Sequence, residues 1–251
     1  MCGIVGYAGD KFVDSLLVAG LERLEYRGYD SAGIATLNRG KLKIKKTAGK
    51  IQLLKEKLKE DPLGGELGIG HTRWATHGEP TLENAHPHTD CREEIAVIHN
   101  GIIENFQLLR DKLIKEGHIF KTDTDTEVIA HLIEKFLEDD LHLAVRKSLK
   151  FLKGSYALAV ISRKDPDKIV AARWESPLVI GMGKDENFLA SDVGAILNLT
   201  SRIIFLEDGQ TATITKNEVK VFGKDGSLIK KRVKRLKWEI LRGPKKDGYR
   251  H

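Results

Sequence analysis

The second residue of the chain, Cys2, combines two groups that can do chemistry together. Removal of Met1 would leave this cysteine first, so one residue would carry both a thiol and a free α-amine. A thiolate is a strong nucleophile, and a free α-amine, whose unperturbed pKa is about 7.7–8.0, can act as a base near neutral pH. Cys2 can therefore supply both nucleophile and base, although the first six residues alone are equally compatible with an incidental cysteine.

Three further positions carry groups suited to binding or stabilising charge. Arg73 follows an expected strand, where its guanidinium can bind a carboxylate through two parallel hydrogen bonds or form an ordinary surface ion pair. Asn100 and the Gly101 N–H can together stabilise a developing oxyanion, although an Asn-Gly pair is also common in plain turns. Asp125 can receive an ammonium group, or it can simply stabilise the first turn of a helix. Each residue, taken alone, has an ordinary structural explanation.

The segment 71–91 contains four histidines and a cysteine that together resemble a zinc-binding set. They are His71, His77, His86, His88 and Cys91. Their spacing lacks the Cys-x-x-Cys and His-x-x-x-His pairs that are typical of zinc sites, although His86-Pro87-His88 could bring two imidazoles together. The spacing favours hydrogen bonding within a loop, and we predict neither a metal nor a cofactor.

Composition narrows the class of protein. The 251 residues suit one large domain or two small ones, and no apolar run approaches the roughly 20 residues of a membrane helix. Only two cysteines are present, and a reducing compartment would keep both as thiols. We therefore expect a soluble, cytoplasmic protein without a structural disulfide and without a membrane segment.

The net charge of +6 comes from the C-terminal end of the chain. Residues 230–251 contain ten Lys or Arg and two acidic residues, which leaves 32 basic and 34 acidic residues in 1–229. A nearly neutral body and a tail without an RNA-binding signature argue against nucleic-acid binding. We interpret the basic segment, which Gly243-Pro244 interrupts, as a solvated linker or docking segment.

The candidate residues lie near the ends of expected strands and helices. Ile4 and Val5 predict a short buried strand that would hold Cys2 in place, and further strands are expected at 33–37, 42–47, 67–71, 95–99 and over most of 155–233. Helices are expected after a cap at Asp10, at 51–58, at 106–117, after a capping box at 124–127, and at 141–152. Strands at both ends with helices between them favour two mainly antiparallel sheets covered by helices.

Several sequence motifs, and their order along the chain, resemble those of one family, the glutaminase domains of class II glutamine amidotransferases. Within that family they resemble the glutamine-fructose-6-phosphate aminotransferases (glucosamine-6-phosphate synthases). The matching segments cover essentially the whole chain and are 1–6, 24–33, 71–80, 84–88, 99–105, 124–132, 176–181 and 190–192. Other class II amidotransferases share the terminal cysteine and the Asn-Gly pair. Their segments equivalent to Tyr-Arg-Gly-Tyr-Asp and Thr-Arg-Trp-Ala-Thr-His have different sequences.

The resemblance implies an α+β fold, the four-layer αββα sandwich of N-terminal nucleophile hydrolases, and cleavage of the side-chain amide of glutamine. By position, Cys2 would be the nucleophile with its α-amine as the base. Asn100 and the Gly101 N–H would form the oxyanion hole. A nucleophile, a base and an oxyanion hole agree with what the residues themselves suggest.

The resemblance also assigns substrate-binding and supporting roles. Arg73 would bind the α-carboxylate of glutamine and Asp125 its α-ammonium. Arg27 and Gly28 would lie against the terminus that carries the nucleophile. The loop that closes over glutamine would contain Trp74, Thr76 and His77.

In this family the domain continues into paired sugar-phosphate isomerase domains that bind fructose-6-phosphate. We therefore expect a glutaminase domain at 1–229 and a basic linker at 230–251, either excised from a longer chain or joined by partner domains on a separate chain. The implied role is to supply ammonia for hexosamine biosynthesis. Fructose-6-phosphate would bind only the isomerase domains, and a homo-oligomer is allowed for the full-length protein.

Two alternatives stay open at this point. The chain could be the glutaminase half of another class II amidotransferase, such as the one that makes phosphoribosylamine. It could also be a catalytically inactive module that senses glutamine. The presence of Cys2, Arg73, Asn100 and Asp125 together argues against the inactive module.

Overall fold

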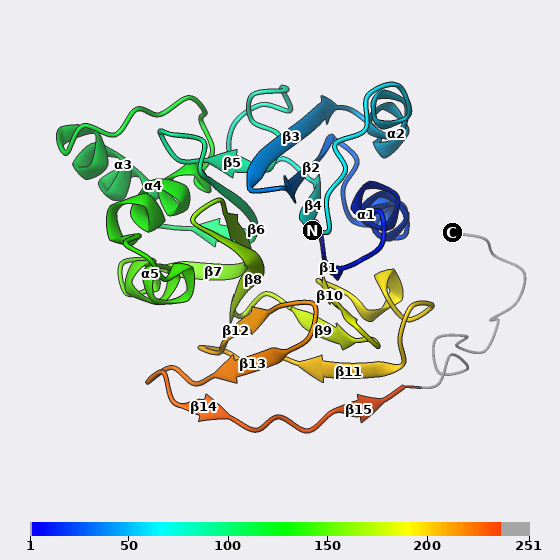
Figure 1. The fold of residues 1–251 in the computed structure, drawn as a ribbon. Helices are drawn as coiled ribbons and strands as arrows, with labels where there is room; N and C mark the ends of the chain where they lie inside the picture. The colour runs from blue at the N-terminus through cyan, green and yellow to red at the C-terminus, as the bar shows by residue number, and fades with distance from the viewer. Residues whose placement is uncertain (1, 237–251) are drawn as a thin grey trace, which may run out of the picture.

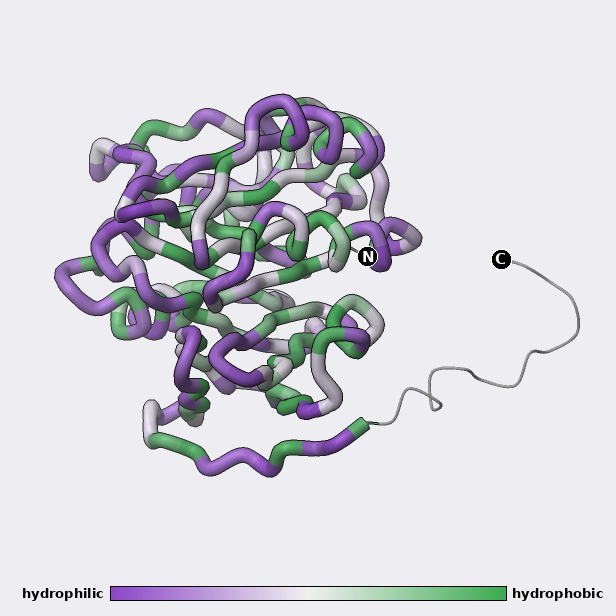
Figure 2. Tube along the Cα trace, turned by 45° about the vertical axis from the view of Figure 1, so that its right-hand side comes forward, coloured by the Kyte–Doolittle hydropathy of each residue, from purple (hydrophilic) through white to green (hydrophobic). Residues whose placement is uncertain are grey.

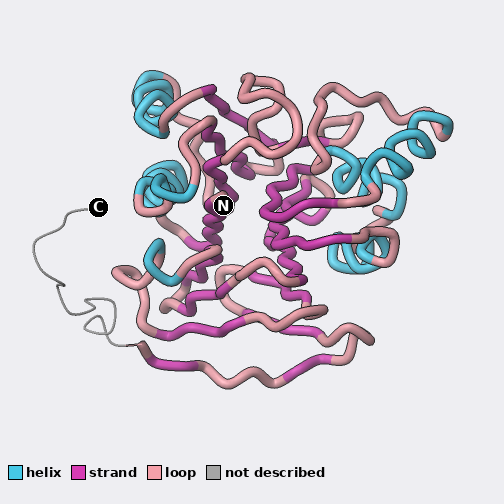
Figure 3. Tube along the Cα trace, turned by 180° about the vertical axis from the view of Figure 1, so that it is seen from behind, coloured by secondary structure: helices cyan, strands magenta, loops and turns pink. Residues whose placement is uncertain are grey.

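Two antiparallel sheets stack face to face in the computed structural model, which describes residues 2–236 (Figure 1). Seen from behind, the sheets stand side by side and each carries helices on its outer side (Figure 3). The predicted α+β sandwich of two antiparallel sheets is therefore confirmed. Met1 and most of the expected linker, residues 237–251, lie outside the described part of the chain.

The first sheet has eight strands with β1 near its centre, in the order β15-β11-β9-β10-β1-β4-β2-β3. The strands are β1 (Gly3–Gly9), β2 (Ser31–Asn38), β3 (Lys41–Ala48), β4 (Leu67–Arg73), β9 (Val179–Met182), β10 (Glu186–Ala190), β11 (Arg202–Phe205) and β15 (Lys234–Arg235). β1 pairs with β10 on one side and β4 on the other. Cys2 therefore enters a strand that is fixed along both edges.

The second sheet has seven strands in the order β14-β13-β12-β8-β7-β6-β5. They are β5 (His88–Thr89), β6 (Ile95–Ile103), β7 (Gly154–Ser162), β8 (Asp165–Trp174), β12 (Thr211–Ile214), β13 (Val219–Phe222) and β14 (Leu228–Ile229). We expected the strand at 95–99 to end before Asn100-Gly101. It continues to Ile103, because β7 pairs with it residue by residue as far as Gly154.

Helices cover the outer face of each sheet. α1 (Val13–Glu22) and α2 (Ile51–Glu60) pack on the first sheet, and α3 (Phe106–Lys115), α4 (Glu127–Phe136) and α5 (Leu141–Leu149) lie on the second (Figure 1). Two 3-10 helices, η1 (Glu25–Arg27) and η2 (Val193–Ala195), lie in connections. Helices that are grouped in the sequence thus stay grouped in space.

The two faces of each sheet contact different cores, because successive strand side chains point to opposite sides. In β1, Ile4 lies between the sheets while Val5 packs under the helices, and in β6 Ile98 and Val97 are divided in the same way. Both faces are apolar, so these strands read as continuous hydrophobic runs. Figure 2 shows hydrophobic stretches along the inner strands and hydrophilic outer loops.

The two expected helix caps are wrong. Asp10 forms an ion pair with Lys216, and α1 begins at Val13 without a side-chain cap. At the start of α4, Asp125 accepts a hydrogen bond from the Ile103 N–H, while Glu127 accepts from the N–H groups of Lys121 and Thr122. The Glu127 carboxylate, which a capping box would use, instead binds the chain segment just before the helix.

The chain remains part of the sandwich after residue 229. Lys234 and Arg235 form β15, which pairs with β11 at the edge of the first sheet. The domain division at residue 229 stays a prediction. Within residues 2–236, none of the helices is both long and apolar enough to span a membrane.

Candidate active site

Cys2 is held at the start of β1 by contacts on both sides. The Ile4 N–H donates to Ser191 Oγ at 3.0 Å, and the Ser191 N–H donates to the Ile4 carbonyl at 3.0 Å. The Trp74 N–H donates to Cys2 Sγ at 3.2 Å. Burial raises the pKa of the Cys2 thiol, and the Trp74 N–H only partly opposes this. The resting sulfur is therefore a thiol, which needs a base before it can attack.

Asn100 contacts the cysteine directly. Its Nδ2 donates to the Cys2 carbonyl at 3.0 Å, and its Oδ1 lies 3.0 Å from His71 Nε2. The same His71 nitrogen lies 3.0 Å from the His99 carbonyl, so its two neighbours are acceptors and it must carry the proton. His71 therefore fixes which end of the Asn100 amide faces Cys2.

Gly101 occupies a position that only glycine suits. Its φ is 129°, and a Cβ atom there would lie 2.1 Å from the Ser155 carbonyl oxygen. β6 pairs with β7 both before and after Gly101 along the chain, and this pairing holds the unusual backbone conformation in place. Asn100 and Gly101 thus present a fixed segment of β6 beside the cysteine.

Buried imidazoles behind this segment form a chain of hydrogen bonds. His86 Nδ1 accepts from the His99 N–H, and Thr126 Oγ1 lies 3.4 Å from His86 Nε2 and 3.0 Å from His99 Nδ1. Burial lowers the pKa of His71 to about 3, and it lowers those of His86 and His99 as well. These histidines are neutral at physiological pH, so they position groups rather than supply charge.

Hydrogen bonding, the role that spacing favoured for the loop histidines, is confirmed for His71, His86 and His88. His88 Nε2 lies 3.2 Å from Thr124 Oγ1. The sequence did not reveal that His99 and Thr126 belong to the same network. The partners come from three distant segments, and no spacing pattern joins them.

Arg73 is the last residue of β4, and its side chain is only 3% exposed. Its guanidinium donates to the carbonyls of Glu79 at 3.1 Å and Gly78 at 3.0 Å, and to that of His77. Among the described residues, all of its hydrogen-bond partners are backbone carbonyls. A buried cation without a carboxylate partner is a favourable place for an incoming anion.

Asp125 lies on the same cavity as Arg73 and is 4% exposed. Its Oδ2 accepts from the Ile103 N–H at 2.7 Å, which ties the carboxylate to the end of β6. The cavity contains an anion and a cation, and the thiol faces the same space. Its lining includes Cys2, Arg73, Trp74, Thr76, His77, Gly101 and Asp125.

This cavity is nearly closed by the segment that follows Arg73. Its volume is about 20 Å³, which is room for about one water molecule. Trp74 is 46% exposed and packs edge-on against Tyr29 with ring centroids 5.7 Å apart. A ligand the size of an amino acid needs more room than this cavity offers.

The Tyr-Arg-Gly-Tyr-Asp segment supports the backbone beside Cys2. A Cβ atom on Gly28 would lie 2.7 Å from the Trp74 nitrogen, so glycine permits the close approach that leaves the Trp74 N–H facing sulfur. Asp30 Oδ2 accepts from the Ala75 N–H at 2.8 Å. Arg27 forms an ion pair with Asp192 and donates to the Tyr26 hydroxyl at 3.0 Å.

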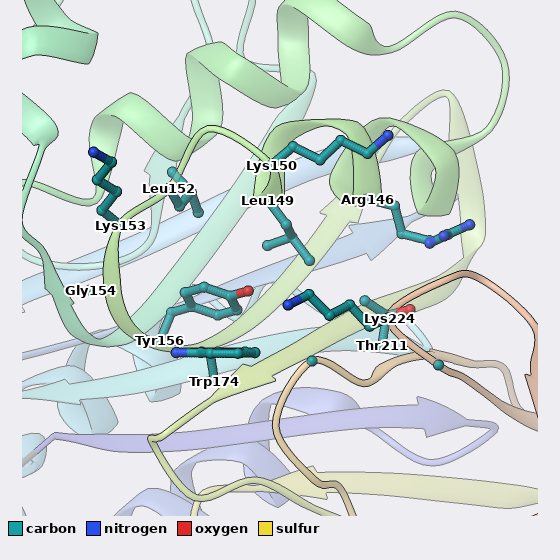
Figure 4. Close-up of a pocket in the computed structure, with 12 residues that line it drawn as sticks. Arg146, Leu149, Lys150, Leu152, Lys153, Gly154, Tyr156, Trp174, Thr211 and Lys224 are labelled. Atoms are coloured by element: carbon teal, nitrogen blue, oxygen red, sulfur yellow. The ribbon is translucent and has the colours of Figure 1, made fainter.

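A larger cavity of about 370 Å³ lies between α5 and the second sheet (Figure 4). Four cationic side chains and two aromatic rings contribute to its lining, and they are Arg146, Lys150, Lys153, Lys224, Tyr156 and Trp174. None of the predicted site residues lines it. Its lining contains neither a cysteine nor a carboxylate.

Comparisons with known proteins identify the family of the chain. The glutamine amidotransferase domain family matches residues 71–198, which is about half of the chain. The chain is 49% identical over 251 residues to glutamine-fructose-6-phosphate aminotransferase of Clostridium acetobutylicum and 52% identical over 256 residues to that of Pyrococcus horikoshii. All of this chain is covered, but only 41% and 42% of those relatives.

Among solved structures, the glutamine phosphoribosylpyrophosphate amidotransferase of B. subtilis superimposes with a TM-score of 0.78 at 29% identity, covering 90% of this chain and 50% of that one. A structure of the allosteric regulatory enzyme of purine biosynthesis gives the same TM-score at 30% identity, covering 89% and 49%. The αββα sandwich is thus that of the N-terminal nucleophile amidotransferases, as the resemblance implied. The chain belongs to the glutamine amidotransferase domain family.

Proposed function

We propose that this chain hydrolyses the side-chain amide of glutamine to glutamate and ammonia. The observation that carries the proposal is the convergence of Cys2, Gly101, Arg73 and Asp125 on one enclosed cavity, with the Asn100 amide bonded to the Cys2 carbonyl. Glutamine is a zwitterion with an amide at its far end. A cation, an anion and a nucleophile with nearby hydrogen-bond donors match those three features.

In the proposed reaction Cys2 Sγ attacks the amide carbon of glutamine. The α-amine of Cys2, free after removal of Met1, takes the thiol proton and passes it to the departing ammonia. Water then attacks the resulting thioester, the amine accepts a proton from that water, and return of the proton to sulfur releases glutamate. A thiol whose pKa is raised by burial needs such a base.

The negative charge that develops on the amide oxygen would be stabilised by Asn100 Nδ2 and the Gly101 N–H. The Asn100 amide has two hydrogens, and the Cys2 carbonyl occupies one of them. The second amide hydrogen is available to a substrate bound at the Cys2 sulfur. His71 keeps the donor end directed there without movement during the reaction.

Arg73 and Asp125 would recognise the two charges of the amino acid, while Trp74, Thr76 and His77 close over it. Arg73→Ala and Asp125→Ala should each raise the KM for glutamine much more than they lower kcat. The test is steady-state kinetics with glutamine and with an analogue that lacks the α-carboxylate. Arg73→Ala should raise the KM for that analogue only slightly. An increase in KM as large as that for glutamine would contradict the assignment.

A matched pair of substrates tests the other charge. An analogue without the α-amine should be nearly insensitive to Asp125→Ala, while it stays sensitive to Arg73→Ala. Arg73 also holds the carbonyls of residues 77–79, so Arg73→Lys serves as a control that keeps the charge but loses the fork of donors. An intermediate KM for Arg73→Lys is expected.

The chain spans about two fifths of the length of the curated relatives it matches. From their name we infer that it is the ammonia-supplying half of glucosamine-6-phosphate synthesis, with the glutaminase domain at 1–229 and a linker at 230–251 whose first part, at β15, still pairs with the sandwich. Fructose-6-phosphate would bind the remaining domains. A cytoplasmic location and a homo-oligomeric full-length protein fit the same role.

Product analysis tests this division of labour. The chain incubated with glutamine and fructose-6-phosphate should yield glutamate and ammonia in equal amounts and no amino sugar. Omitting fructose-6-phosphate should leave the yield of glutamate unchanged. Formation of glucosamine-6-phosphate by the pure chain would contradict the domain assignment, and absence of glutamate would contradict the proposed activity.

The second candidate is the glutaminase half of a phosphoribosylpyrophosphate amidotransferase, which the structural neighbours favour. Their identity of 29–30% is well below the 49–52% of the aminotransferases. The assembly that carries this chain in its native host would separate the two. Fructose-6-phosphate should stimulate its glutaminase activity, and phosphoribosylpyrophosphate should not.

A further inference from the structure

Four side chains of types that can bind a metal lie close together on the outer, helix-covered side of the second sheet, outside the candidate active site. Their ligand atoms are Cys91 Sγ, His118 Nδ1, His131 Nδ1 and Glu134 Oε2, and all lie within 4.8 Å of one another. Cys91 lies in the turn before β6, and His118 follows α3. His131 and Glu134, three residues apart, share one face of α4.

The two distances to the Cys91 sulfur match those of a tetrahedral zinc site, and the two to the Glu134 oxygen are shorter. Cys91 Sγ lies 3.6 Å from His118 Nδ1 and 3.5 Å from His131 Nδ1. Glu134 Oε2 lies 2.9 Å and 3.2 Å from the same two nitrogens. Zinc bonds of about 2.0–2.3 Å at tetrahedral angles place neighbouring ligand atoms roughly 3.3–3.6 Å apart. To admit the ion, the Glu134 oxygen would move away from the two nitrogens by a few tenths of an ångström.

The groups behind the ligands suit a metal centre as well. His131 is 1% exposed, and its other nitrogen, Nε2, is buried without a hydrogen bond but lies 3.6 Å from Glu127 Oε1. A metal on Nδ1 would place the proton on Nε2, facing that carboxylate, which is the usual arrangement behind a zinc-bound histidine. The Ile119 N–H donates to Cys91 Sγ at 3.5 Å, a contact that favours a thiolate.

We propose that Cys91, His118, His131 and Glu134 bind one Zn²⁺ ion. Zinc binds the thiolate, so the Cys91 proton is released to solvent when the ion enters. With four protein ligands and no open position, the ion would be structural rather than catalytic. It would join the turn before β6, the α3–α4 connection and α4 itself.

This site stabilises elements that lead to the candidate active site. α4 follows directly after Asp125 and Thr126, and β6 contains Asn100. The prediction that the chain binds no metal rested on the spacing of the loop histidines. The structure removes Cys91 from that set, and the two histidines that accompany it lie on later segments.

The test uses the Cys2→Ala protein, because the chain has only two cysteines and Cys91 is then the sole thiol. Titration with Co²⁺ should give one ion per chain, a thiolate-to-cobalt charge-transfer band and the strong visible bands of tetrahedral cobalt. Zn²⁺ should displace the cobalt and raise the Tm, and a chelator should reverse that rise. Absence of the charge-transfer band would overturn the proposal.

Substitutions then identify the ligands. Cys91→Ser should abolish the charge-transfer band and the Tm rise, and Glu127→Gln should weaken zinc binding about 10–100-fold. His142→Gln and Glu93→Gln are matched controls, since they alter a buried histidine and a nearby carboxylate outside the cluster, and both should retain one zinc. Unchanged zinc content in Cys91→Ser would also overturn the proposal. If that variant does not fold, the cobalt spectrum of the Cys2→Ala protein decides.

Discussion

The Cys2→Ala variant should release no glutamate from glutamine above background while it still binds glutamine. In the proposed mechanism the thiol forms the covalent intermediate, whereas Arg73 and Asp125 recognise the charges of the substrate. Methyl replacement of the thiol removes the acceptor of the Trp74 N–H but leaves the Ile4–Ser191 contacts intact. A glutamate-release assay paired with calorimetric titration of glutamine measures both quantities.

Two controls distinguish the contribution of the Cys2 thiol to activity from that of its α-amine. Cys2→Ser retains an acceptor for the Trp74 N–H but has a much weaker nucleophile, so its activity should also be lost. A form that retains Met1 keeps the thiol, yet its Cys2 nitrogen is an amide and can no longer act as a base. Mass spectrometry identifies each form. Turnover by the Met1-retaining protein comparable to that of the trimmed one would show that the α-amine is not the base.

The framework of the site was predictable because hydrophobic patterning is local. Ile4 and Val5 predicted the strand that follows Cys2, and the strands expected at 33–37 and 42–47 lie within β2 and β3. Arg73 was expected at the end of a strand, where it lies. These features follow from the alternation of side chains and from turn residues, which a single sequence displays directly.

The partners of the polar groups were not predictable in the same way. Residues 124–127 match the capping-box motif. In the structure, however, N–H groups of β6 and of the α3–α4 connection bind Asp125 and Glu127. Cys91 likewise lies among loop histidines in the sequence and beside His118 and His131 in space. Which donor meets which acceptor depends on how distant segments pack, and no local pattern contains that information.

Asn100→Ala should lower kcat about 10²–10³-fold with little change in KM, a loss of about 2.7–4 kcal/mol of transition-state stabilisation. The side chain gives up one donor that acts only when charge develops on the amide oxygen. The fold should survive, because His71 Nε2 keeps its second acceptor, the His99 carbonyl. Steady-state kinetics on the trimmed enzyme, together with its Tm, measures both effects.

Two further variants decide whether Asn100 acts as a donor or only positions its neighbours. Asn100→Asp keeps the shape and the oxygen that His71 contacts but replaces the donor with negative charge, so it should be less active than Asn100→Ala. Asn105→Ala removes an amide that bonds Phe151 and Lys153 beyond the end of β6, and its activity should stay close to that of the parent. If Asn100→Asp retained parental kcat, the side chain would be a positioning residue, and the Gly101 N–H would have to stabilise the oxyanion without it.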